Sequence, residues 1–245
     1  MRILLTVTYD GTDFCGYQIQ PDKRTVEQTL EESLEKAVGS RVKTIASGRT
    51  DSGVHALSQK VHFDTDADIP PEKFAAAINA FLPKDVKILK SEKVADDFSA
   101  RYSAKEKTYR YSVVLSKIDE PLLLRYAVAV KFPVNVEKMK EAAKVIKGTH
   151  DFKAFCASGS SVKDTVRTVK SIKIVKKGRK IDFFVTGNGF LYNMVRIIAG
   201  TLISAGEGKT DVKDIESAFL TGNRDKLGKT MPSEGLCLFS VKYKI

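Results

Sequence analysis

Hydrophobic and polar positions alternate along the chain with two different periods. Apolar residues recur every three to four positions between Val26 and Val38, which is the period of an amphipathic helix. Thr25 and Gln28 stand where the two partners of an N-terminal capping box belong. The pattern therefore predicts a helix over residues 26–38, beginning directly after Thr25.

The first hundred residues contain further segments with the period of strands or helices. Strands are predicted at residues 3–9, 42–47, 59–66 and 86–94, and a second helix is predicted at residues 71–81. The order of elements is β-α-β-β-α-β.

The rest of the chain repeats this order with one addition. Strands are predicted at residues 108–115, 166–175, 180–185 and 236–243, where the middle two form a hairpin. Helices are predicted at residues 136–146 and 191–204, and an extra helix is predicted at residues 211–220.

This repeated order predicts an α+β protein made of two ferredoxin-like units. Residues 1–100 form the first unit, and residues 101–245 form the second unit, which carries the extra helix. Units of this kind place their antiparallel sheets side by side with helices on one face, which leaves the other face for a ligand. We expect a basic groove over that open face.

Charge is distributed unevenly between the two units. Residues 101–182 contain 20 Lys or Arg against 8 Asp or Glu, whereas residues 1–100 contain 13 against 16. A concentrated positive field suits a polyanion, because Lys and Arg beside phosphates release condensed counterions. A nucleic acid is therefore the leading partner, although a solvated basic surface would have the same composition.

Cysteine usage and hydropathy bear on the location of the protein. Cys15, Cys156 and Cys237 are odd in number and far apart, which fits reduced thiols in a cytoplasm. No apolar run approaches the roughly 18 residues of a membrane span, and no signal peptide is visible. We expect a cytoplasmic protein that makes no membrane contact.

The densest group of reactive side chains is GRTDSGVHA at residues 48–56, between two predicted strands. Its glycines bracket Arg49 and Asp51, as expected of a tight loop that presents functional groups to a ligand. Gly, Asp and Ser also favour turns for conformational reasons alone. An arginine two residues before the aspartate is harder to explain by turn chemistry.

The tripeptide Asp51-Ser52-Gly53 also matches the aspartic proteases. That chemistry needs two carboxylates that share one proton, and the chain contains no second Asp-Ser-Gly or Asp-Thr-Gly. Arg49 would moreover hold the acid ionised. A protease is therefore disfavoured.

The whole nonapeptide resembles the catalytic signature of the tRNA pseudouridine synthase A family. Further segments resemble the family in matching order: YDGTDFCGYQIQP at 9–21, RTVEQTLEESL at 24–34, FSARYSAKEKTYRY at 98–111 and GNGFLYNMVRIIAG at 187–200. The resemblance spans nearly the whole chain. It implies the pseudouridine synthase fold, in which the two units are related by a pseudo-two-fold axis.

The resemblance also implies a role for each candidate residue. Asp51 is similar to the catalytic aspartate, which attacks the uridine or its ribose, and Arg49 is similar to an arginine that draws the uridine from its stack. Tyr109 corresponds to the tyrosine that packs against the base, and Arg196 to the arginine that pairs with the aspartate. No role is implied for His55 or for the cysteines.

For two of these residues, the residue chemistry alone also allows a purely structural interpretation. Tyr109 lies on a predicted strand, where a tyrosine can equally fill a core. Arg196 is the only charge in an apolar helix, and a buried guanidinium requires an anion unless it reaches solvent at the helix edge.

The resemblance implies further properties of the reaction. The substrate would be tRNA, at uridines 38–40 of the anticodon stem and loop, and the enzyme would be a homodimer. No cofactor and no metal are expected, and the absence of a Walker loop, a dinucleotide fingerprint and paired metal ligands agrees with this. A catalytically silent RNA-binding module and a synthase for another RNA stay open as alternatives.

Overall fold

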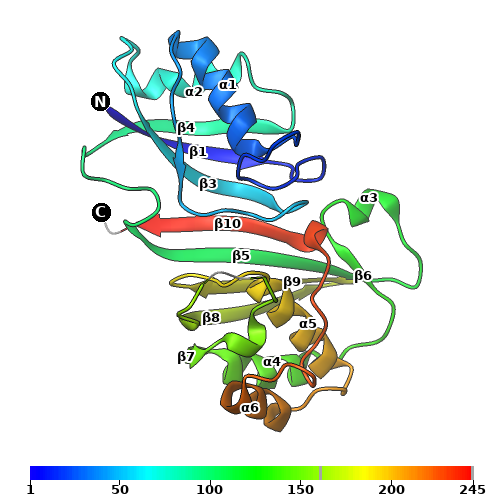
Figure 1. Ribbon diagram of the computed structural model, residues 1–245. Helices are drawn as coiled ribbons and strands as arrows, with labels where there is room; N and C mark the ends of the chain where they lie inside the picture. The colour runs from blue at the N-terminus through cyan, green and yellow to red at the C-terminus, as the bar shows by residue number, and fades with distance from the viewer. Residues whose placement is uncertain (160–161, 244–245) are drawn as a thin grey trace. The chain divides into compact units, whose positions relative to one another are not determined.

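The computed structural model describes residues 1–159 and 162–243. Its backbone divides into two compact units, shown in Figure 1. The first unit comprises Met1–Lys105 together with the C-terminal residues from Cys237 onward, and the second comprises Glu106–Leu236. The sequence pattern places the boundary near residue 100 and assigns the last strand to the second unit, so the two divisions differ at the C-terminus.

The sheet of the first unit is built around one central strand. β1 (Arg2–Tyr9) pairs antiparallel with β3 (His55–Asp64) on one side and with β4 (Val86–Val94) on the other. β2 (Ile45–Ala46) pairs antiparallel with β3. The resulting order, β4-β1-β3-β2, is that of a ferredoxin-like unit. β10 (Leu236–Tyr243) adds a parallel pairing to the start of β3.

Two helices complete the first unit. α1 (Val26–Val38) and α2 (Phe74–Asn79), the latter preceded by the 3₁₀ turn Pro71–Lys73, pack together over the sheet (Figure 1). The side chains between helices and sheet are fully or almost fully buried: Ile3, Leu5, Val7, Val26, Leu30, Leu34, Phe63, Phe74 and Ile78. This core holds the strands that carry the candidate loop.

The sheet of the second unit is also mostly antiparallel. β5 (Ala104–Leu115) pairs with β9 (Lys180–Gly187), β9 with β8 (Val166–Lys177), and β8 with β7 (Gly148–Asp151), all antiparallel. The short β6 (Val128–Val130) pairs with β5 in parallel.

The described residues of the second unit form four helices: α3 (Pro121–Leu124), α4 (Val136–Ile146), α5 (Met194–Gly206) and α6 (Val212–Thr221). The last three lie together in Figure 1. Short 3₁₀ turns occupy Lys153–Phe155 and Ser233–Gly235. Within the described residues, no helix combines the length and the apolarity that crossing a membrane requires.

The predicted helix over residues 26–38 is confirmed at both ends. Its N-cap is Thr25, whose side chain accepts a hydrogen bond from the backbone N–H of Gln28 at 3.4 Å. The predicted capping box is only half formed, because the Gln28 side chain donates to Glu32 at 2.8 Å instead. Gly39 ends the helix with φ +75°, a conformation that glycine adopts without strain.

Several predicted strands have different lengths in the structure; the one expected at 108–115, for example, begins at Ala104 as β5. The strand expected at 42–47 is reduced to β2, because the backbone N–H of Thr44 donates to the Glu31 carboxylate at 2.7 Å and not to another strand. The strand expected at 59–66 begins at His55 as β3, because Ala56 pairs with Tyr9 and with Leu238. These partners are remote in sequence and leave no local signal.

Three elements are missing from the sequence prediction: α3, β6 and β7. Each contains three or four residues, too few to establish a period. The helix expected at 191–204 begins only at Met194, because Asn193 adopts a left-handed backbone with φ +59°.

Candidate active site

The candidate loop between β2 and β3 turns sharply at its aspartate. The backbone N–H of Val54 donates to the carbonyl of Asp51 at 3.1 Å, which closes a turn. Gly53 within this turn has φ +76°, a region that glycine enters without steric cost. Asp51 is half-buried at the turn, while Arg49 and Ser52 are exposed.

A second segment, residues 9–17, holds the candidate loop from one side. The backbone N–H of Tyr17 donates to the carbonyl of Thr50 at 3.0 Å, and that of Gly53 donates to the carbonyl of Phe14 at 3.3 Å. The Ser52 hydroxyl also donates to Phe14, at 3.2 Å. Part of YDGTDFCGYQIQP therefore fixes the backbone on both sides of Asp51.

Buried side chains hold the loop from inside the unit. Tyr9 and Thr50 share a hydrogen bond between their hydroxyl oxygens at 2.8 Å. Gln59 on β3 accepts from the Ser47 hydroxyl at 2.6 Å and donates from its amide to the Gly48 carbonyl at 2.8 Å. A loop anchored in this way holds its carboxylate in one place, as pre-organised catalysis requires.

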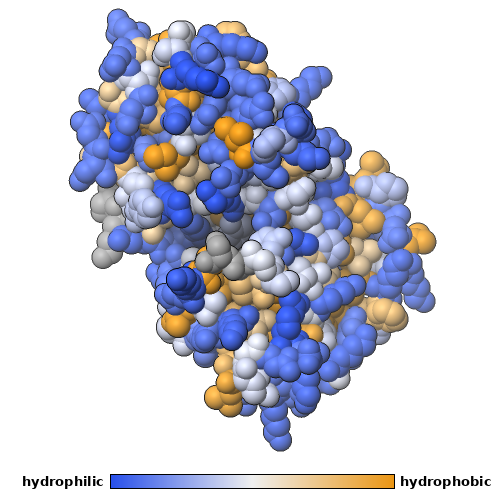
Figure 2. Space-filling view, viewed as in Figure 1, coloured by the Kyte–Doolittle hydropathy of each residue, from blue (hydrophilic) through white to orange (hydrophobic). Residues whose placement is uncertain are grey.

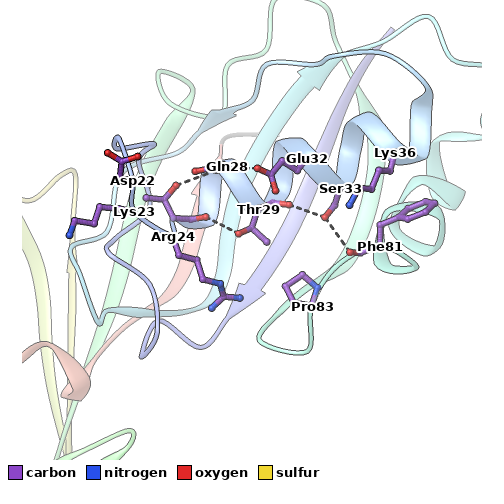
Figure 3. A pocket seen from close by; sticks show the side chains of 11 residues that line it. Asp22, Lys23, Arg24, Gln28, Thr29, Glu32, Ser33, Lys36, Phe81 and Pro83 are labelled. Carbon is purple, nitrogen blue, oxygen red and sulfur yellow. Dashed lines mark hydrogen bonds between the residues drawn. The ribbon is translucent and has the colours of Figure 1, made fainter.

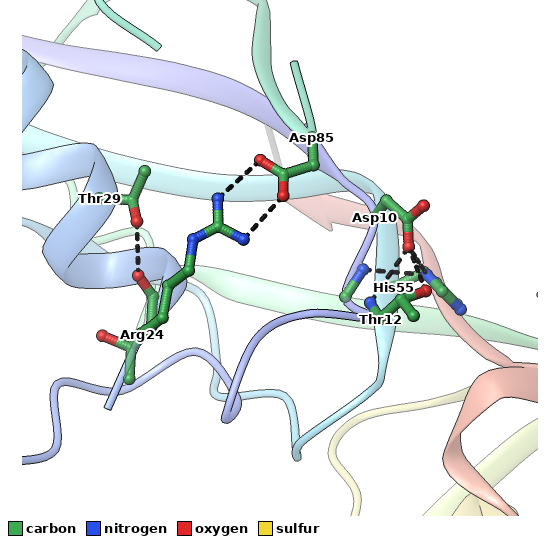
Figure 4. A network of polar contacts seen from close by, with 8 residues as sticks. Asp10, Thr12, Arg24, Thr29, His55 and Asp85 are labelled. Atoms are coloured by element: carbon green, nitrogen blue, oxygen red, sulfur yellow. Dashed lines mark hydrogen bonds and ion pairs between the residues drawn. The ribbon is translucent and has the colours of Figure 1, made fainter. Parts of the chain in front are cut away.

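His55 joins the end of the candidate loop to residues 10–12 (Figure 4). It is buried, and its Nδ1 lies 3.0 Å from the backbone nitrogen of Gly11 and 3.2 Å from Oδ1 of Asp10. The backbone and hydroxyl of Thr12 both donate to the same Asp10 oxygen, at 3.1 Å and 2.6 Å. The sequence assigned no role to His55; here it connects two motif segments.

Glycine is required at position 11 by close packing. A Cβ added to Gly11 would lie 2.1 Å from the carbonyl oxygen of Val54, inside any permissible contact. Residue 11 thus lies directly against the backbone that follows Asp51.

Tyr109 lies on β5 of the second unit, opposite Val185 of β9. It is half-buried, and its ring meets that of Phe190 edge to face, with centroids 5.3 Å apart. Lys107 and Tyr111 share its face of the strand through the predicted alternation. Tyr111 is fully buried, whereas Tyr109 is only half-buried.

Arg196 lies half-buried in the first turn of α5. Its Nε donates to the carbonyl oxygen of Met231 at 2.6 Å, and its Nη1 donates to Oδ1 of Asn193, also at 2.6 Å. Sequence reasoning expected an anion beside this guanidinium. The second unit supplies two neutral acceptors, and the pairing with Asp51 stays a prediction.

Two of the four predicted site residues belong to the first unit, and two belong to the second. Arg49 and Asp51 share one loop of the first unit, while Tyr109 and Arg196 belong to β5 and α5 of the second. Sequence reasoning missed the residues that hold them in place, namely Tyr9, Gln59, His55, Asn193 and Met231. The only signal for most of these was membership of the quoted motif segments.

Basic side chains follow the strand β8. Lys170, Lys173, Lys176 and Lys177 are all exposed. Figure 2 shows mostly hydrophilic side chains on the visible surface, with hydrophobic ones scattered between them. A row of exposed lysines on one strand suits contacts with phosphates.

A surface pocket lies beside α1 (Figure 3). It is lined by Asp22, Lys23, Arg24, Thr25, Gln28, Thr29, Glu32, Ser33, Lys36, Phe81 and Pro83. Arg24 is already held by both oxygens of Asp85, at 2.8 and 2.9 Å. None of the predicted site residues lines this pocket. In the part of the chain that the structure describes, no group of three His, Cys, Asp or Glu side chains could hold a metal ion.

Comparison with known proteins shows which family has a sequence like that of this chain. The tRNA pseudouridine synthase family model matches residues 5–103 and 142–244. The matched segments include Asp51 and Arg196, whereas Tyr109 lies between them. The chain belongs to the tRNA pseudouridine synthase family, and it is an isomerase that forms pseudouridine in tRNA.

Individual relatives match over almost the whole chain. The tRNA pseudouridine synthase A of Bacillus licheniformis is 46% identical over 245 residues, covering 99% of each chain. That of Halalkalibacterium halodurans is 46% identical over 236 residues, covering 96% of this chain and 90% of its own. A crystal structure of a Cbf5–Nop10–Gar1 complex covers 82% of this chain and 54% of that one, with 14% identity and a TM-score of 0.37.

Proposed function

We propose that the enzyme converts uridines 38–40 of the tRNA anticodon stem and loop into pseudouridine, with Asp51 as the nucleophile and without a cofactor. The observation that carries this proposal is the anchoring of the Asp51 turn. Hydrogen bonds from residues 9–17 and from Gln59 hold the loop on two sides. A carboxylate fixed in this manner keeps its orientation when a nucleotide arrives.

The chemistry requires only groups that the chain and the substrate provide. The carboxylate of Asp51 attacks either C1′ of the ribose or C6 of the base, and the N1–C1′ bond breaks. The base then turns, C5 bonds to C1′, the proton on C5 leaves and N1 gains a proton. The carboxylate is regenerated, and no atom is oxidised or reduced. The reaction therefore needs no redox partner and no nucleoside triphosphate.

The other predicted residues support this step. Arg49, exposed beside Asp51, helps to draw the uridine out of its stack, which offsets part of the cost of flipping. The ring of the half-buried Tyr109 stacks on the flipped base, and its hydroxyl assists removal of the C5 proton. Arg196 pairs with Asp51 and holds it ionised.

Recognition of the tRNA rests on the basic second unit. The exposed lysines of β8 grip phosphates and set the register, without reading the sequence. The enzyme acts as a homodimer in which both subunits hold one tRNA. We place it in the cytoplasm, where tRNA is modified and where its three free cysteines stay reduced.

Position and cofactor use are tested together with unmodified tRNA transcripts. Purified enzyme is incubated with a transcript in monovalent salt and EDTA, and pseudouridine is mapped at single-nucleotide resolution. The account predicts pseudouridine at positions 38–40 and an undiminished rate in EDTA. Modification elsewhere would contradict the assigned position, and loss of activity in EDTA would contradict cofactor-free chemistry.

The dimer is tested separately by light scattering. The enzyme is measured alone and with one equivalent of tRNA. The account predicts the mass of two chains, and then of two chains with one tRNA. A single chain on each tRNA would contradict it.

A further inference from the structure

Asn193 has a backbone conformation that few residues other than glycine adopt. Its φ is +59°, and it directly precedes the first residue of α5. Such a conformation costs energy unless the surroundings over-determine it, and it concentrates at functional sites. Asn tolerates it better than most residues. Its side chain caps no backbone N–H of α5, so helix capping does not explain why an asparagine occupies this position.

The Asn193 side chain instead contacts the guanidinium of Arg196. Oδ1 accepts from Nη1 at 2.6 Å, while the Met231 carbonyl accepts from Nε at 2.6 Å. Two acceptors on different nitrogens fix the plane of the guanidinium as well as its position. These bonds use two of its five N–H groups. Within the described residues of the second unit, Nη2 has no acceptor, so that side of the fork can meet an anion.

The second acceptor belongs to a segment that is itself held firmly. We call residues 228–235 the strap. The backbone N–H of Met231 donates to the carbonyl of Arg196 at 3.3 Å, and the Tyr111 hydroxyl donates to the carbonyl of Pro232 at 2.8 Å. A Cβ added to Gly228 would lie 2.1 Å from the backbone of Gly200 on α5. The strap therefore has little freedom to move the Met231 carbonyl.

We propose that Asn193 is a positioning residue that, together with the Met231 carbonyl, fixes the plane of the Arg196 guanidinium and leaves its Nη2 edge for an anion. The inference rests on the proposed function, in which Arg196 pairs with Asp51. It explains why the chain accepts a strained asparagine immediately before α5. A bidentate ion pair requires the guanidinium and the carboxylate to lie in one plane. Loss of one of the two acceptors lets the Arg196 guanidinium rotate out of that plane.

The test replaces Asn193 with glycine, which adopts φ +59° without strain and removes only the acceptor. Asp22→Gly is the matched control, because Asp22 is the other described residue besides glycine with a positive φ, +55°. Single-turnover rates are measured by tritium release from C5-labelled uridine in tRNA, beside the Kd for tRNA and the Tm. We expect Asn193→Gly to slow turnover by about tenfold to a hundredfold, as small misplacements of catalytic groups do. Its Kd and Tm should match those of Asp22→Gly.

A second comparison separates this inference from the proposed function. Arg196→Met and the double variant Asn193→Gly/Arg196→Met are followed in the same assay over hours. If Asn193 acts through Arg196, the double variant is no slower than Arg196→Met alone. Normal turnover by Arg196→Met would remove Arg196 from the proposed function. If Arg196→Met is slow, the inference about Asn193 is overturned by normal turnover of Asn193→Gly, by an extra loss in the double variant, or by a Tm far below that of Asp22→Gly.

Discussion

The phenolic oxygen of Tyr9 lies 2.8 Å from the hydroxyl oxygen of Thr50, and both side chains are buried. Tyr9 is the last residue of the central strand β1, and Thr50 directly precedes Asp51. Burial raises the pKa of the Tyr9 phenol, which keeps the group protonated. The hydrogen bond therefore transmits the rigidity of the sheet to the residue next to the proposed nucleophile.

Replacing Tyr9 with phenylalanine removes one hydroxyl and leaves that of Thr50 buried without this partner. The free energy of unfolding should fall by about 1–3 kcal/mol, the usual cost of such a loss. Denaturant unfolding measures it, with Tyr102→Phe as the control, because Tyr102 is 78% exposed. Turnover should fall more than tRNA affinity. A Tyr9→Phe protein as stable as Tyr102→Phe would show that this contact contributes nothing.

Adding a methyl group at Gly11 should disturb the Asp51 loop directly. The Cβ of Gly11→Ala would lie 2.1 Å from the Val54 carbonyl oxygen, so the backbone must shift at a cost of about 1–3 kcal/mol or more. Gly189→Ala is the control for stability, because its nearest neighbours would be 3.8 Å away. Thermal unfolding compares the two. Equal Tm values would contradict the close packing described here.

Stability should depend on pH through His62. Burial, followed by the nearby Arg2, lowers the pKa of His62 from 6.5. The unfolded chain then binds a proton that the folded chain resists, so the free energy of unfolding falls as pH drops below 6.5 and through the folded-state pKa. Nδ1 of His62 accepts from the backbone of Ala100 at 3.1 Å, and His62→Gln retains an acceptor that does not titrate.

The measurement is denaturant unfolding of the parent and of His62→Gln across about pH 5 to 7. The parent should lose stability faster than the variant as pH falls. Parallel curves for the two proteins would show that His62 takes no part in the pH dependence.

Elements with strong local signals could be predicted from the sequence. The helix at 136–146 is confirmed at both ends, because its apolar spacing agrees with an asparagine cap at Asn135. The strands at 86–94 and 236–243 are confirmed in extent as β4 and β10. The pairing of β10 was not predictable, because its contact with His55 and Ala56 joins residues about 180 positions apart.

The candidate site likewise contains residues that a local sequence signal marks and residues that none marks. The motif at 48–56 marks Asp51, because carboxylate, arginine and glycines stand together in a short loop. The residues that hold the loop and the guanidinium carried no such signal. Gln59 is an ordinary strand residue in the sequence pattern, and Asn193 falls inside the helix predicted at residues 191–204. Only the folded chain brings Gln59 to Gly48 and turns Asn193 back towards Arg196.

The most direct test of the central claim is Asp51→Asn, which is nearly isosteric and leaves Gly48 and Gly53 in place. Tritium release from C5-labelled uridine in tRNA is measured beside a filter-binding curve. The account predicts tRNA binding close to that of the parent, with turnover reduced at least about 10³-fold, because an amide lacks the charge and nucleophilicity of the carboxylate. Normal tritium release by the sequence-verified variant would remove Asp51 from the mechanism and contradict the account.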